Sequence, residues 1–118
     1  MIVLIIGAGS VGSSIARELA GHGHHITIID EKPEIIGKTE ITDVQWIIGD
    51  ACELSVLRRA KPETCDVIVA ATGDDKSNLV VSLLARSEFG VPRTVARVNN
   101  PKNEWLFNDA WGVDVAVS

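Results

Sequence analysis

The chain has 118 residues, a formal net charge of −5 at pH 7 and a hydrophobic content of 46%. This length suits one domain that buries a core without disulfides, and this composition excludes an intrinsically disordered chain. The apolar runs are too short to span a membrane. The basic cluster Arg58, Arg59 and Lys61 is too small for a nucleic-acid groove. We therefore expect neither direct membrane insertion nor a nucleic-acid partner.

Short apolar runs predict six strands along the chain. The first run, Ile2–Ile6, follows no basic segment and stops at a glycine. This pattern is typical of a parallel strand that is buried on both faces, and not of a signal peptide. Further strands are expected at 25–29, 44–48, 67–71, 94–98 and 113–117.

Amphipathic stretches between the strands predict helices. Val11, Ile15 and Leu19 recur every four residues and mark one helix face, which ends at Gly21 and Gly23. Two short helices are expected, one near Ile35 and Ile36 and one that starts near Glu53 and stops before Pro62. A long helix is expected over Asp74–Phe89, with Leu79, Val80, Leu83 and Leu84 facing inward. A last helix begins at Asn100 and Pro101 and carries Trp105, Leu106 and Phe107.

This alternation of strands and helices predicts an α/β fold with three layers. Short connections make each crossover right-handed and the sheet parallel. The natural arrangement is the doubly wound Rossmann fold, with six parallel strands in the order 3-2-1-4-5-6 and 1–118 as a single domain. Its ligand crevice lies outside the carboxyl ends of the strands, where the order reverses. The residues that we expect at this edge are Gly7, Asp30, Asp50, Thr72 and Arg97.

The segment Gly7-Ala8-Gly9-Ser10-Val11-Gly12 is a complete G-x-G-x-x-G motif between a predicted strand and a predicted helix. Gly7 permits a tight turn, Gly9 lets a phosphate approach the backbone, and Gly12 lets the helix pack on the strand. The helix N-terminus then offers free N–H donors to the phosphates. The alternative is a glycine-rich turn without a ligand, which the next motif disfavours.

Asp30 follows Gly7 by 23 residues (30 − 7), at the end of the second predicted strand. The dinucleotide fingerprint places an acid at about this offset, where it accepts hydrogen bonds from ribose hydroxyls. A carboxylate there repels a 2′-phosphate, so the sequence favours NAD over NADP. Lys32 weakens this preference, and a solvated loop acid is the alternative interpretation of Asp30.

Three further acids, Asp50, Asp74 and Asp75, stand near strand ends, and each can be interpreted as a ligand-binding residue or as a helix cap. Asp50 either accepts the adenine amino group or caps the following helix. Asp74 and Asp75, which follow Thr72 and Gly73, are favoured as helix caps over ligands, because two adjacent acids repel a diphosphate.

The residue types argue against catalysis. The chain has no tyrosine, which excludes the Tyr-Lys pair of short-chain dehydrogenases. Three histidines at positions 22, 24 and 25 crowd a turn at the opposite end of the sheet, where solvated histidines are expected. Cys52 and Cys65 have no metal or redox spacing and are interpreted as two buried small hydrophobic residues in a reducing compartment. We expect a domain that binds an adenine nucleotide without transforming it.

Five segments together carry a resemblance to a known family. They are G-A-G-x-V-G at 7–12, I-D-E at 29–31, G-D-A at 49–51, A-T-G-D-D-x-x-N at 71–78 and A-R-V-N-N-P-K-N at 96–103. Together they resemble the N-terminal domain of the TrkA proteins, also called the KTN or RCK domain. These proteins are cytosolic regulators of bacterial and archaeal potassium uptake.

The resemblance implies a ligand-sensing regulatory module that binds NAD or NADH, or alternatively ATP or ADP. It also implies a homodimer or higher homo-oligomer that docks on a membrane potassium transporter or channel at the cytoplasmic face. The implied site residues are Gly7, Ala8, Gly9, Ser10, Val11, Gly12, Asp30, Glu31, Asp50, Ala51, Thr72, Gly73 and Arg97.

Two departures from the family pattern are informative. ATP-switched relatives carry an arginine where this chain has Ser10, so NAD is favoured. The family domain also continues into a crossover helix and a C-terminal lobe, so we expect this chain to be truncated or the N-terminal piece of a longer protein. The alternative functions are the cofactor-binding half of an NAD-dependent oxidoreductase and a redox-sensing transcription regulator.

Overall fold

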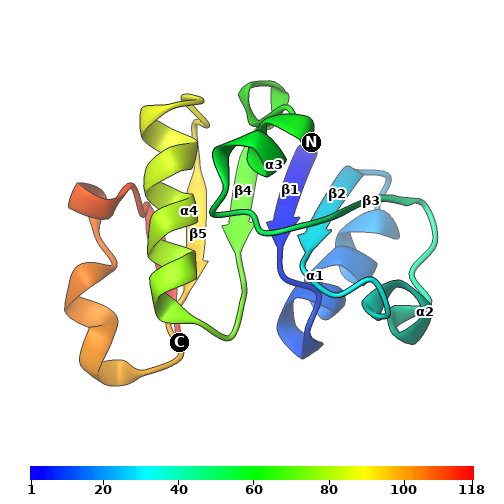
Figure 1. Cartoon of the computed structure of the whole chain (residues 1–118), viewed down its shortest axis with the longest axis horizontal. Coiled ribbons are helices and arrows are strands. Elements are labelled where there is room, and N and C mark those ends of the chain that lie inside the picture. Colours follow the sequence, from blue (N-terminus) through cyan, green and yellow to red (C-terminus); the bar gives the residue numbers. More distant parts are fainter.

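The computed structural model describes residues 1–118 and contains one six-stranded parallel sheet in the order β3-β2-β1-β4-β5-β6, as predicted. In Figure 1, α3 and α4 lie in front of the sheet and α1 lies behind it. The strands are β1 (Ile2–Ile6), β2 (His25–Asp30), β3 (Val44–Ile48), β4 (Val67–Ala70), β5 (Thr94–Arg97) and β6 (Val115–Val117). The helices are α1 (Ser10–Ala20), α2 (Ile35–Thr39), α3 (Leu54–Arg59) and α4 (Asp75–Ser87), with 3-10 turns η1 (Pro62–Thr64), η2 (Pro101–Leu106) and η3 (Asp109–Trp111).

The core lies on both faces of the central strand β1. Leu4 and Ile6 pack in the cluster beneath α3 and α4, whereas Val3 and Ile5 pack in the cluster beneath α1. All four side chains are almost completely buried, as expected of a parallel strand that is covered on both sides.

The register of the sheet brings the strand ends to one edge. Ile6 pairs with Ile29 on one side and with Ala70 on the other. The residues that follow these positions, Gly7, Asp30 and Ala71, therefore lie side by side at this edge. Because strand order reverses between β1 and β4, the two connections diverge and leave a crevice between them.

The inner face of α4 differs from the sequence prediction. Leu79 is buried as expected, but Val80 and Leu83 are 37% and 36% exposed. The buried face of α4 consists of Leu79, Val81 and Ala85 together with the polar residues Asp75, Asn78 and Ser82, and Leu84 packs against the core. The segment after η3 packs closely on this helix, since a Cβ at Gly112 would lie 2.6 Å from the Ser82 carbonyl oxygen.

The segment after β5 also departs from the prediction. The expected helix is the 3-10 turn η2, and Trp105 on it is 74% exposed. Phe107 directly after η2 is buried and anchors the segment. β6 is shorter than expected, because residues 113 and 114 belong to the turn that enters the strand.

Candidate nucleotide-binding site

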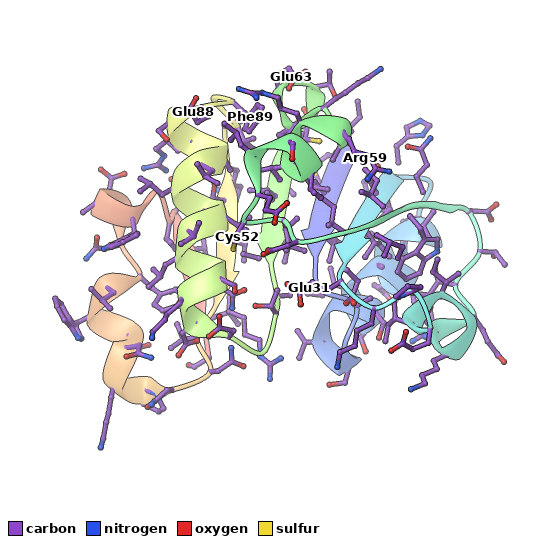
Figure 2. All side chains as sticks on the ribbon, in the orientation of Figure 1. Glu31, Cys52, Arg59, Glu63, Glu88 and Phe89 are labelled. Carbon is purple, nitrogen blue, oxygen red and sulfur yellow. The ribbon has the colours of Figure 1, made fainter.

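A cleft of about 480 Å³ opens at the carboxyl ends of the central strands. Eight of the residues that we predicted for the site line it: Gly7, Gly9, Asp30, Glu31, Asp50, Ala51, Thr72 and Gly73. The other lining residues are Ile29, Lys32, Ile35, Gly49, Cys52, Asp74 and Ser77, which the sequence analysis did not assign to the site. Figure 2 shows Glu31 near this end of the sheet, whereas Arg59 and Glu63 lie at the opposite end.

The glycine loop has the geometry that its motif predicts. Gly7 has a φ of +94°, which side chains rarely tolerate, and a Cβ at Gly12 would lie 1.9 Å from the Gly7 carbonyl oxygen. A Cβ at Gly9 would meet no heavy atom within 4 Å, so the space above it is open. Gly7 and Gly12 therefore build the turn, and Gly9 leaves room for a ligand.

The first turn of α1 presents unpaired hydrogen-bond donors beside this space. Gly9 is the N-cap without a side-chain cap, and the N–H groups of Ser10, Val11 and Gly12 have no acceptor in the chain. Unpaired N–H groups at a helix N-terminus bind anions well, because they combine donors with the positive end of the helix dipole. The loop thus fits a phosphate or diphosphate group.

Asp30 is fixed at the adjoining edge of the cleft. Its Oδ2 accepts the Ala8 N–H at 2.8 Å, and its Oδ1 accepts the Lys32 N–H at 2.9 Å. The Ala8 N–H is therefore not free for a phosphate. Each carboxylate oxygen keeps a further lone pair, so Asp30 can still accept hydrogen bonds from ribose hydroxyls while it holds the glycine loop against β2.

Asp50 does not cap α3, so that interpretation is wrong. Its Oδ1 accepts the Cys52 N–H at 2.9 Å, which tightens the loop, and the N-cap position of α3 belongs to Glu53. Asp50 and Ala51 line the cleft, where the carboxylate can still reach a base. The ligand role of Asp50 remains a prediction.

The two cysteines differ in position, although both were predicted to be buried. Cys65 is 5% exposed, but Cys52 (labelled in Figure 2) is only partly buried and lines the cleft. Burial raises the pKa of the Cys52 thiol, and the nearby Asp50 carboxylate adds to this effect. A protonated thiol is a weak nucleophile, so Cys52 offers the cleft a small neutral side chain.

Asp74 and Asp75 have different roles. Asp74 caps α4, and its hydrogen bonds from Ser77 lower its pKa, which confirms the cap prediction for this residue. Asp75 points away from the cleft and is 7% exposed. Of these two acids, only Asp74 lines the cleft, so the predicted pair of adjacent acids does not face a diphosphate there.

The charged side chains around the cleft are mostly acidic. Lys32 is the one cation among the lining residues, against the acids Asp30, Glu31, Asp50 and Asp74. Arg97 does not line the cleft; its carbonyl oxygen accepts a hydrogen bond from Asn78 Nδ2 at 3.0 Å.

The histidines lie at the far end of the sheet, in the turn before β2. His22 and His25 are exposed, and the half-buried His24 has its Nδ1 at 2.8 Å from the N-terminal amine. This location agrees with the predicted solvated histidines. No helix is both long enough and apolar enough to cross a bilayer.

Comparisons with known proteins identify the family of the chain. Residues 3–118 match the TrkA-N domain family. The Trk system potassium uptake protein TrkA of Mycobacterium tuberculosis is 60% identical over 118 residues, which are 100% of this chain and 54% of that protein. The chain thus spans about half the length of the curated relatives that it matches first.

Solved structures share the fold. A GsuK channel bound to NAD has a TM-score of 0.84 at 20% identity, over 98% of this chain and 21% of that chain. The Kef CTD of Shewanella denitrificans in its AMP-bound form has a TM-score of 0.84 at 24% identity, over 98% of this chain and 70% of that chain. With the family match over nearly every residue, the chain belongs to the TrkA-N domain family.

Proposed function

We propose that this chain binds NAD or NADH in the cleft and acts as a ligand-sensing regulatory part of a potassium uptake system. The observation that carries the proposal is the row of unpaired N–H groups at Ser10, Val11 and Gly12, beside the open space over Gly9. The diphosphate lies over these donors, and Asp30 accepts hydrogen bonds from the adenosine ribose.

The charges of the cleft favour a dinucleotide over ATP. A triphosphate brings more negative charge to a wall that has four acids and one lysine. Ser10 offers no guanidinium to hold a terminal phosphate. A solved relative of this fold carries NAD and another carries AMP, which is compatible with an adenosine subsite that both ligand types share.

We further propose that the chain does not transform its ligand. The cleft contains neither histidine nor tyrosine, and its Cys52 thiol has a raised pKa. The oxidoreductase and transcription-regulator alternatives require an acid–base group or a DNA-binding element, and the family match to potassium uptake proteins favours the regulatory function.

The partners that we propose are a second copy of the chain and a membrane potassium transporter or channel subunit, reached from the cytoplasmic face. Exposed apolar side chains on α4 and η2, namely Val80, Leu83 and Trp105, are the candidates for contacts in self-association. Figure 1 shows both elements on the side of the sheet that holds β5. Exposed large apolar residues can mark interaction surfaces.

A competition titration by calorimetry tests the ligand. NAD, NADH, ADP, AMP and ATP are compared with and without magnesium, on the parent chain and on Arg97→Ala. We expect NAD or NADH to bind most tightly and Arg97→Ala to change little. ATP that binds at least tenfold tighter than NAD would contradict the proposal, and loss of that advantage in Arg97→Ala would identify Arg97 as the phosphate clamp.

A further inference from the structure

A continuous set of hydrogen bonds leads from Thr72, which lines the cleft, to η2. The glycine loop packs closely on Thr72 without a hydrogen bond, since a Cβ at Gly7 would lie 3.0 Å from the Thr72 Cα atom. The Thr72 carbonyl oxygen accepts the side-chain amides of Asn78 and Asn99, each at 3.0 Å. A shift of the glycine loop therefore presses on Thr72, whose backbone is tied to the segment after β5.

Asp75 is the next residue in this set of hydrogen bonds. Its Oδ1 accepts the Asn99 N–H at 2.7 Å and the Asn99 Nδ2 at 3.2 Å. Its Oδ2 accepts the Asn100 N–H and the Asn103 Nδ2, both at 2.9 Å. Burial alone would raise the pKa of this carboxyl, but the four hydrogen bonds lower it, so Asp75 is a carboxylate at neutral pH.

The path ends at an exposed apolar side chain. Asn103 lies on η2, two residues before Trp105, which is 74% exposed. The Asn100 side chain also caps η2 by accepting the Lys102 N–H at 3.0 Å. The orientation of η2, and with it that of Trp105, therefore depends on the Asp75 carboxylate.

We propose that Asp75 is a positioning residue that couples occupancy of the cleft to the conformation of η2. The inference rests on the proposed function, since it requires a ligand at the glycine loop. A ligand that fixes the glycine loop fixes Thr72, and the bonds from Thr72 through Asn99 and Asp75 transfer this restraint to η2. The exposed surface that carries Trp105 is thereby ordered when the cleft is filled.

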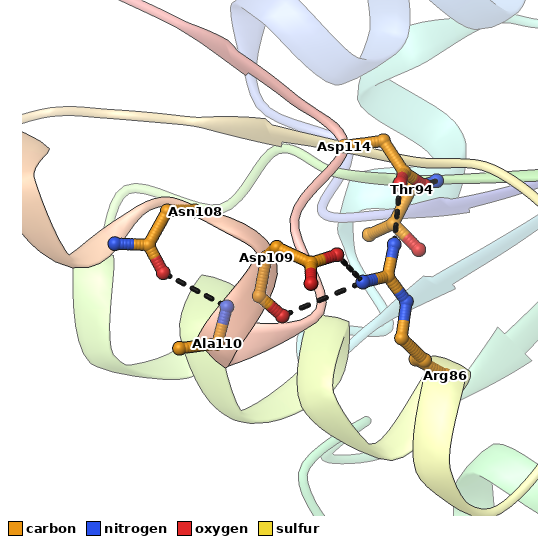
Figure 3. A network of polar contacts seen from close by, with 6 residues as sticks. All are labelled: Arg86, Thr94, Asn108, Asp109, Ala110 and Asp114. Atoms are coloured by element: carbon orange, nitrogen blue, oxygen red, sulfur yellow. Dashed lines mark hydrogen bonds and ion pairs between the residues drawn. The ribbon is translucent and has the colours of Figure 1, made fainter.

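A second hydrogen-bonded carboxylate, Asp114, whose side chain is 30% exposed, provides a control at the other end of α4. Asp114 accepts the Thr94 N–H at 2.7 Å and pairs with Arg86, which also pairs with Asp109, as Figure 3 shows. Like Asp75, it ties α4 to a neighbouring segment through backbone and side-chain bonds. Asp114 has no hydrogen bond to Thr72 or η2. Its substitution therefore shows the effect of lower stability while the bonds from Thr72 to η2 stay intact.

The experiment uses Trp105 as the reporter. Trp46→Phe and Trp111→Phe leave it as the one tryptophan in the chain, and acrylamide quenching is measured with and without saturating NAD. Calorimetry verifies NAD binding, and sedimentation verifies that the oligomeric state is the same in both conditions. We expect NAD to lower the quenching constant of Trp105. In this background, Asp75→Asn and Asn103→Ser lose the change, and Asp114→Asn keeps it.

The two variants disturb the fold in different ways. Asp75→Asn places an amide donor against backbone N–H groups, whereas Asn103→Ser removes only the bond from Asn103 to Asp75. A loss of the Trp105 response in both variants therefore does not come from one shared folding defect. NAD binding without any change at Trp105 in the reporter chain would overturn the inference. So would a change that persists in both path variants, or one that Asp114→Asn also abolishes. Failure of the parent chain to bind NAD would instead contradict the proposed function, and this inference with it.

Discussion

Replacing Gly9 with leucine tests the phosphate cradle with little effect on folding. Gly9 has φ −69° and ψ −165°, which any residue adopts, and its Cβ direction is open. We therefore expect the free energy of unfolding to change by less than about 1 kcal/mol. The leucine side chain fills the space in front of the first-turn N–H groups of α1. Loss of two charge-assisted hydrogen bonds at about 1.5 kcal/mol each raises the Kd for NAD roughly a hundredfold.

Gly37→Leu is the matched control for this change. A Cβ at Gly37 also meets nothing within 4 Å, but Gly37 lies on α2 and does not line the cleft. Titration calorimetry with NAD and thermal unfolding of both variants separate binding from stability. An unchanged Kd in Gly9→Leu would refute the cradle, and an equal loss in Gly37→Leu would show that the effect does not depend on the site.

Three further predictions concern charge, association and pH. Asp30→Ala should weaken NAD binding about tenfold more than NADP binding, because it removes ribose hydrogen bonds for both but a phosphate repulsion only for NADP; equal losses in calorimetry would exclude the ribose contact. Trp105→Ser should lower the dimer fraction in sedimentation, and an unchanged fraction would place the interface elsewhere. The pKa values of Asp75 and Asp114 are lowered in the folded chain, so their contribution to stability is present above the ordinary carboxyl pKa of about 4 and is lost as the pH falls below it. Melting temperatures between about pH 5 and pH 3 should therefore fall less steeply in Asp75→Asn than in the parent, and parallel curves would contradict this reasoning.

The residues at strand ends could be placed from the sequence because parallel register leaves little freedom. Once the apolar run Ile2–Ile6 and its successors are aligned in the order 3-2-1-4-5-6, Gly7, Asp30 and Thr72 must meet at one edge. The glycine spacing then determines the turn. The conformation of the loops after the strands could not be predicted in this way. Cys52, for example, lines the cleft because Asp50 accepts its N–H and shapes the loop.

The positions of Lys32 and Ser77 in the cleft illustrate the same limit. Lys32 lies two residues beyond a predicted ligand, and its N–H is bound by Asp30. Ser77 is in the first turn of α4 and donates to the cap Asp74. Lys32 could have been proposed because the sequence analysis already places its charge near the ribose, whereas Ser77 has no residue type that indicates nucleotide binding.

The exposure of Val80 and Leu83 departs from the sequence prediction for a physical reason. Apolar periodicity predicts that these two residues face the core, because burial of apolar area is the dominant favourable contribution to folding. Here the inner side of α4 holds Asn78 and Asp75, whose hydrogen bonds tie β4, β5 and η2 together. A buried polar group is tolerated when it is hydrogen-bonded, and the bonds of these two residues hold α4 in an orientation that buries Leu79, Val81 and Ala85 and leaves Val80 and Leu83 at the surface. The side chains that tie α4 to the edge of the cleft therefore also determine which two of its apolar side chains remain free for a partner.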